Sequence, residues 1–152
     1  MYKWFECKVS YERAGEEGKQ TKVKESYLVD ALSFTEAESR IIEEMRPFAS
    51  GEFNVTDIRR ARFYETFLDE NGDRYYKAKV NMITFDEKSD KEKKTAKQML
   101  VQASSIQGAI DALDKGMKET LADYEIAAMA ETPIVSVFPY GVKEDKPDKH
   151  PV

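Results

Sequence analysis

The stretch YLVDALSFTEAESRIIEEM, residues 27–45, decides how this chain is expected to fold. Its apolar residues recur at intervals of three and four, a spacing that predicts a helix with one apolar stripe. The residues of this stripe are Phe34, Ala37, Ile41 and Met45. Ser33 followed by Glu36 is a capping-box signature, in which the serine oxygen accepts a backbone N–H and the glutamate reaches back. We therefore predict that the helix begins at Ser33 and ends before Pro47.

A second stretch, MLVQASSIQGAIDALDKGM at residues 99–117, repeats the pattern of the first. Its stripe consists of Ile106, Ala109, Leu113 and Met117. The segments before the two helices also match, because FECKV (5–9) and YKAKV (76–80) both alternate apolar and polar residues, as strands with one buried face do. After the helices, FYETF (63–67) corresponds to IVSVF (134–138). Three matches in the same order indicate an internal duplication.

From this pattern we predict an α+β protein made of two ββαβ(β) units, about 3–68 and 74–139. The units are expected to form one pseudo-two-fold symmetric domain over residues 1–140, in which an antiparallel sheet carries both helices on one face. Asn71-Gly72, between the units, predicts a type I′ hairpin because both residues tolerate positive φ. Residues 141–152 are polar and contain proline, so we expect a flexible tail.

The segment after the first helix, residues 52–67, is long for one strand. Its alternation slips near Ile58, which predicts a bulge or a break. Pro133 marks the corresponding break in the second unit, because proline cannot donate a hydrogen bond inside a sheet. Four strands would then lie between the two helices. That order resembles the doubled ββββα units of some single-stranded nucleic-acid binders, a likeness of fold alone.

The composition of the 152 residues is that of a soluble globular chain, with a net charge of −5. The single cysteine, Cys7, excludes an internal disulfide and fits a reducing compartment. The first residues lack the apolar core of a secretion signal, and no apolar run is long enough to span a membrane. We therefore predict a cytoplasmic protein with no membrane partner.

Residues for catalysis or metal binding are scarce. The one histidine, His150, lies in the predicted tail, and the one cysteine, Cys7, is expected to be buried. A catalytic triad therefore lacks its base and its nucleophile. A zinc site of the ordinary type lacks enough ligands. Asp69, Asn71 and Asp73 are spaced as in a calcium loop, but Arg74 and Val80 stand where glycine and glutamate are required. The seven glycines form no phosphate-binding loop. We predict no catalytic residue, no metal, no cofactor and no enzymatic activity.

Charge is distributed unevenly, because basic residues outnumber acidic ones in the extended segments between Lys3 and Lys97 while both helices are acidic. The alternation places an aromatic residue and lysines outward on the first strand of each unit. Such faces bind single-stranded nucleic acid through phosphate neutralisation and base stacking. We therefore predict a non-enzymatic protein that binds single-stranded nucleic acid through such a face. Its candidate phosphate-binding residues are Lys8, Arg59, Arg60, Arg62, Lys77 and Lys79, and its candidate stacking residues are Trp4 and Tyr75.

Two alternatives remain open. Outward lysines on strands also prevent edge-to-edge pairing, which would explain them without any nucleic acid. The first alternative is therefore a protein-interaction or regulatory module, a homodimer or the binder of another protein, that uses an exposed sheet edge or face and binds no nucleic acid. The second alternative is a small-molecule or enzymatic role in a cleft between the units.

Three stretches together resemble a known family. They are YLVDALSFTEAESRIIEEMRPFASGEF at 27–53, DENGDRYYKAKV at 69–80 and KKTAKQMLVQA at 93–103. The family consists of small uncharacterised proteins that recur in gut bacteria and their phages, and it is known only as a domain of unknown function. The resemblance covers roughly Trp4 to Pro139. It implies no activity, but it favours a cytoplasmic location and a link to phages or other mobile elements.

Overall fold

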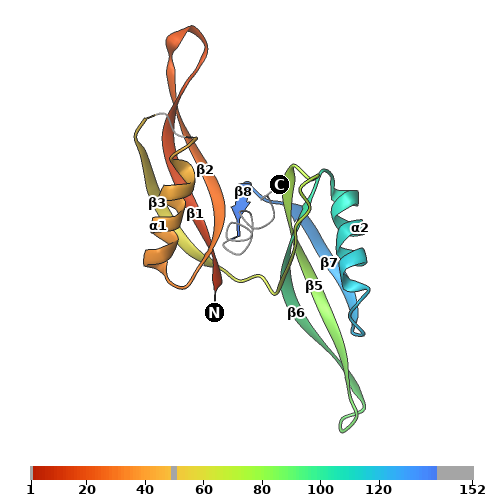
Figure 1. The fold of residues 1–152 in the computed structure, drawn as a ribbon. Coiled ribbons are helices and arrows are strands. Elements are labelled where there is room, and N and C mark those ends of the chain that lie inside the picture. The colour runs from red at the N-terminus through yellow and green to blue at the C-terminus, as the bar shows by residue number, and fades with distance from the viewer. Residues whose placement is uncertain (1, 49–50, 140–152) are drawn as a thin grey trace, which may run out of the picture. The chain divides into compact units, whose positions relative to one another are not determined.

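The computed structural model describes residues 2–48 and 51–139, and it confirms the α+β class (Figure 1). The elements in chain order are β1 (Lys3–Ala14), a short 3-10 turn (Glu16–Gly18), β2 (Gln20–Ala31), α1 (Phe34–Met45), β3 (Phe53–Ala61), β4 (Glu65–Phe67), β5 (Arg74–Asp86), β6 (Lys91–Ala103), α2 (Ile106–Met117), β7 (Asp123–Glu131) and β8 (Ile134–Phe138). The flexible tail predicted at 141–152 lies outside the described residues.

The chain divides into two compact units. Unit 1 comprises residues 1–62 with the segment that begins at Pro133, and unit 2 comprises residues 63–132. Each holds a four-stranded sheet, ordered β3-β1-β2-β8 in unit 1 and β4-β6-β5-β7 in unit 2. The prediction of one antiparallel sheet with both helices on one face is therefore wrong. There are two sheets, each with its own helix (Figure 1). β8 and β4 run parallel to the strands they join.

Each of the two short strands, β4 and β8, joins a different sheet from the strand that precedes it in the sequence. β4 follows β3 in the sequence but pairs with β6, and β8 follows β7 but pairs with β2. The registers correspond, because Phe138 lies opposite Val29 in unit 1 and Phe67 lies opposite Val101 in unit 2. Each sheet is thus completed by a strand that comes from the other half of the sequence.

This exchange explains why the predicted hairpin at Asn71-Gly72 is wrong. The chain reverses direction there, but β6 lies between β4 and β5, so the turn does not join two paired strands, and neither residue has a positive φ. The Asp69 side chain instead accepts a hydrogen bond from the Asn71 N–H at 3.0 Å. Gly72 is needed for a different reason, because a Cβ at this position would lie 2.6 Å from the backbone of Ala103.

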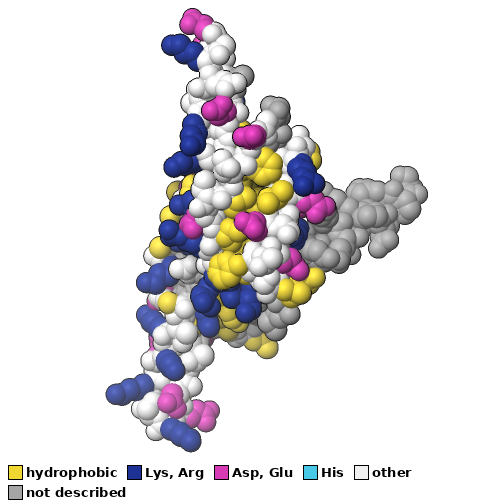
Figure 2. Space-filling model, turned by 90° about the vertical axis from the view of Figure 1, so that its left-hand side faces the viewer, with side chains coloured by type: hydrophobic (Ala, Val, Ile, Leu, Met, Phe, Trp, Pro, Cys, Tyr) yellow, Lys and Arg dark blue, Asp and Glu magenta, His cyan; other side chains and the backbone are white. Residues whose placement is uncertain are grey.

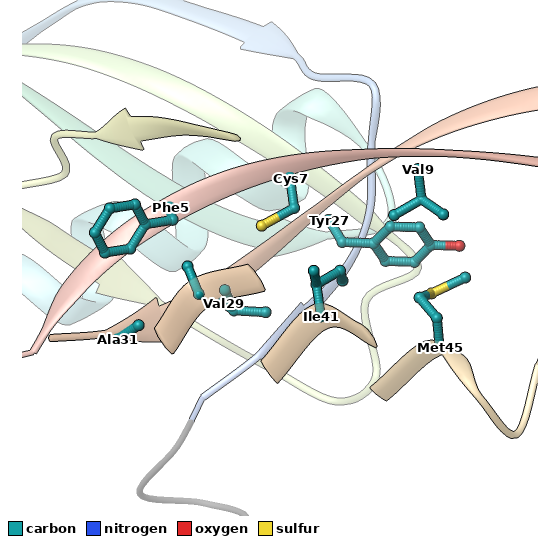
Figure 3. Close-up of a cluster of buried hydrophobic side chains, with 9 residues drawn as sticks. Phe5, Cys7, Val9, Tyr27, Val29, Ala31, Ile41 and Met45 are labelled. Atoms are coloured by element: carbon teal, nitrogen blue, oxygen red, sulfur yellow. The ribbon is translucent and has the colours of Figure 1, made fainter. Parts of the chain in front are cut away.

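Each helix covers one face of its own sheet and forms a core with it (Figure 3). In unit 1 the core contains Phe5, Cys7, Val9, Tyr27, Val29, Ala31, Ala37, Ile41 and Met45. In unit 2 it contains Tyr76, Ala78, Val80, Met99, Val101, Ala103, Ala109, Leu113 and Met117. Full burial of one large apolar side chain contributes about 1.5–3 kcal/mol, so these clusters dominate the stability of each unit.

The predicted start of the first helix and the predicted strand breaks are confirmed. The Ser33 Oγ accepts the Glu36 N–H at 3.1 Å, and Ser105 caps α2 in the same way through the Gly108 N–H at 3.0 Å. The register of β3 against β1 shifts between Val55 and Asp57, which is the irregularity expected near Ile58. β7 and β8 are interrupted around Pro133.

Candidate nucleic-acid interface

In unit 1 the outward face of β1 carries compensated charge. Trp4, Glu6 and Lys8 point away from α1, because the residues that alternate with them belong to the core. Lys8 lies directly opposite Asp57 on β3, and Glu6 lies opposite Arg59. The Arg59 Nε is in turn 2.7 Å from the Asp57 carboxylate. Since each basic group has an acidic neighbour, this face lacks the uncompensated positive charge that phosphates require.

The other candidates in unit 1 do not form one surface. Arg60 lies opposite Phe5 and therefore faces the helix side, where its guanidinium lies 5.8 Å from the centre of the Phe5 ring. Its predicted place on the outward face is wrong, because adjacent strand residues point to opposite faces. Arg62 is exposed but follows the end of β3. Trp4 is partly buried, between Asp30 and Ala61 on the neighbouring strands.

In unit 2 the outward face of β5 is different. Lys77 and Lys79 are both exposed, and their cross-strand neighbours are uncharged. These neighbours are Leu100 and Ala130 for Lys77, and Gln98 and Ala128 for Lys79. The structure thus brings together two lysines, about 7 Å apart along the strand, with no acidic residue opposite either of them.

Tyr75, the predicted stacking residue of this face, is only 7% exposed. The prediction that it stacks on a base from an open surface is therefore wrong. It lies on the outward side of β5 as expected, but alternation shows only which side of a strand a residue occupies, and does not show whether that side is covered.

Further along this face the positive charge is neutralised. The Lys94 ammonium lies 3.0 Å from the Glu125 carboxylate, which also accepts a hydrogen bond from the Asn81 amide at 3.0 Å. The hydrogen bonds from Asn81 and Lys94 lower the pKa of Glu125, and the bond to Glu125 raises the pKa of Lys94. Both groups stay charged near neutral pH, so Lys94 adds little to an anion-binding surface.

Sequence reasoning missed a second group of basic residues, on the helix side of β6. Lys91, Lys93 and Lys97 occupy alternate positions and share the side of the sheet on which Val80 lies. The Lys97 ammonium lies 5.1 Å from the ring centre of Tyr64, which is largely exposed. The alternation in KEKKTAK was the signal that could have shown this row. Figure 2, which shows one side of the molecule, gives the wider context, since basic and acidic side chains are interspersed there.

The chemistry of the remaining side chains is limited. Among residues 2–48 and 51–139, no group of three or more His, Cys, Asp or Glu side chains is arranged to hold a metal ion. Over the same residues, no helix combines the length and the apolar character that crossing a membrane requires.

Cys7 is expected to be chemically inert in the folded protein. The side chain is completely buried, and burial, with a smaller contribution from Glu6, raises the pKa of the thiol to about 12. The reactive thiolate is therefore almost absent at pH 8 in the native state, whereas unfolding restores an ordinary thiol. With Ellman's reagent at pH 8 we expect no fast reaction and full reaction in denaturant. A fast reaction without denaturant would contradict the burial.

Together these features define an α+β protein of two four-stranded sheets, each with one helix, that presents an uncompensated pair of lysines in unit 2. A family model described as Domain of unknown function (DUF4494) matches residues 3–140. The chain therefore belongs to this family, and the resemblance seen in the sequence is confirmed. Comparison with curated proteins gives no match.

Proposed function

We propose that the protein is a non-enzymatic binding protein that contacts single-stranded nucleic acid through the outward face of β5. The observation that carries the proposal is the contrast between the two units. Lys8 has an acidic residue opposite it, whereas Lys77 and Lys79 have none. Their spacing along the strand is similar to that of successive phosphates in an extended single strand, so both ammonium groups are able to contact one backbone.

The double variant Lys77→Glu/Lys79→Glu tests this proposal. We expect it to weaken binding of a fluorescent oligo(dT) by about tenfold or more, because two attractive contacts become repulsive. Binding of the unmodified protein is expected to weaken as salt rises, with a slope of log K against log salt near −1.4 from these two lysines. Fluorescence anisotropy at low and moderate salt measures both quantities.

The matched control is Lys115→Glu/Lys118→Glu, which makes the same change of charge on exposed residues at the end of α2. We expect this control to bind the oligonucleotide nearly as well as the unmodified protein does. Equal losses in both variants would show that only net charge matters. Absence of binding at low salt would remove the proposal altogether.

The second candidate function is a protein-interaction module, and the free sheet edges favour it. β3 and β7 are each nine residues long and form the outer edge of their sheets, where another chain is able to add a strand. Both are interrupted by a register shift, a feature that reduces edge pairing. Light scattering tests the homodimer. A strict monomer that captures no partner would count heavily against this candidate.

We also infer that the two halves of the chain arose by internal duplication. The order of elements, the strand order, the serine caps and the registers of the exchanged strands all correspond, which supports this inference. Comparison of the two halves across many family sequences tests it. Similarity no greater than that of shuffled sequences would refute the duplication. A cytoplasmic location and a link to phages stay predictions.

A further inference from the structure

A groove in unit 2 has chemistry that the proposed nucleic-acid contact does not use. It has a volume of about 940 Å³ and lies between β4, the loop that follows it and the C-terminal half of α2. Apolar side chains line part of it: Phe67, Leu68, Ala112 and Met117. Four carboxylates line it as well, from Glu65, Asp69, Glu70 and Glu119, against a single base, Lys115.

Unit 1 shows what occupies the corresponding place there. Arg40 on α1 is buried, and its guanidinium donates to the carboxylate of Asp30 at 2.7 Å and to that of Glu44 at 3.3 Å. The same group also donates to the Phe138 carbonyl of β8, at 3.3 Å. One guanidinium therefore joins the helix, the exchanged strand and two carboxylates.

In unit 2 the helix supplies no such group. By the shared positions of the caps and stripes, Ala112 corresponds to Arg40 and Gly116 corresponds to Glu44. Phe67 corresponds to Phe138, because each lies opposite the equivalent valine of its sheet. A Cβ at Gly116 would overlap the Phe67 ring, so the glycine allows β4 to approach the helix. With two small residues on the helix, no side chain comparable to Arg40 or Glu44 extends from it. The Phe67 ring lies over Gly116, and both residues line the groove.

The groove favours a positive charge. Its lining residues include the last turn of α2, where the helix dipole places partial negative charge, and the four carboxylates add to this potential. The loop that forms one wall is held in place by Gln102, whose amide accepts the Asp69 N–H at 3.0 Å and donates to the Gly72 carbonyl at 2.9 Å. A wall fixed in this way loses little entropy on binding.

We propose that this groove binds an extended peptide segment of a partner protein through an arginine or lysine side chain. β4 is the outer strand of its sheet, so a peptide strand is able to lie along its free edge. Apolar side chains of the peptide contact Phe67 and Leu68, and its cationic side chain lies among the carboxylates. Arg40 of unit 1 has no counterpart among the residues that line the groove, so the cation comes from the partner.

The experiment uses the full ¹⁵N-labelled chain and a blocked hexapeptide of alternating valine and arginine. Amide chemical shifts are followed by NMR as the peptide is added. We expect saturable shifts at Leu68, Gly116 and Thr120, with a dissociation constant below about 1 mM. A hexapeptide of alternating valine and glutamate is expected to cause none of these shifts.

Two variants make the test specific. Glu70→Lys/Glu119→Lys reverses two exposed rim charges and is expected to weaken binding at least tenfold. The control Glu38→Lys/Glu52→Lys makes the same change on exposed residues of unit 1 and is expected to leave binding intact. Ala112→Arg, which installs the arginine found in unit 1 and leaves Gly116 and its contact with Phe67 unchanged, is expected to weaken binding at least tenfold, because the protein's own cation then competes with that of the peptide.

Three outcomes would overturn the proposal. They are shifts outside the groove only, equal binding of the glutamate peptide, and unchanged affinity after reversal of the rim charges. Groove shifts that depend on protein concentration without any peptide would assign the groove to a second copy of the chain, which also overturns it. None of these results bears on Lys77 and Lys79, so the nucleic-acid proposal stands or falls separately.

Discussion

Replacing Arg40 by alanine is expected to lower the free energy of unfolding by about 3–5 kcal/mol. The side chain is only 7% exposed and is the shared partner of Asp30 and Glu44, which are themselves mostly buried. Its removal leaves two carboxylates in a poorly solvated place without their cation, and it also frees the Phe138 carbonyl. Urea denaturation followed by circular dichroism measures the loss.

Arg59→Ala is the matched control. Its guanidinium lies as close to a carboxylate, 2.7 Å from Asp57, but its side chain is 74% exposed. An exposed pair contributes about 0–1 kcal/mol, so the control is expected to be nearly neutral. Similar losses in the two variants would show that burial does not determine the contribution of Arg40.

Ending the chain after Thr132 is expected to unfold much of unit 1 while unit 2 stays folded. The truncation removes β8, although β8 is distant in sequence from the strand with which it pairs. Unit 1 loses the buried Ile134 and the stacking of Phe138 on Tyr27 at 5.8 Å. Burial of Ile134 contributes about 1.5–3 kcal/mol and the partly buried Phe138 adds to it, which is a large share of the stability of a small unit.

Hydrogen exchange distinguishes the two units in this experiment. We expect the amides of β1 and β2 to lose protection, whereas those of β5 and β6 keep it, because unit 2 lies entirely within residues 63–132. A chain that ends after Pro139 keeps β8 and serves as the control, with both units protected. Equal loss of protection in both units would show that they do not unfold separately.

Local patterns were enough to predict the elements of this fold. The apolar stripes predicted both helices, because a period near 3.6 depends only on neighbours in the chain. The cap at Ser33 and the break at Pro133 were equally local. Alternation also predicted the outward side of β1 and β5, including the exposed positions of Lys77 and Lys79.

The pairing of β4 and β8 could not be predicted in this way. Strands of three and five residues carry little pattern, and which sheet they join depends on the path of the whole chain. The same limit applies to Tyr75. Alternation correctly placed its side chain on the outward side of β5, but it could not show that this side chain is buried. Arg40 was missed because an arginine beside a stripe gives no sign that it will be buried.

The exchange of β4 and β8 also determines the order in which a ribosome releases complete units. Unit 2 is finished when Thr132 emerges, although it lies later in the chain, whereas the sheet of unit 1 waits for residues 134–138. At about 5–20 residues per second, the wait after β3 lasts several seconds, with the edge of β2 unpaired in the meantime. The half that is synthesised first is therefore the half that matures last.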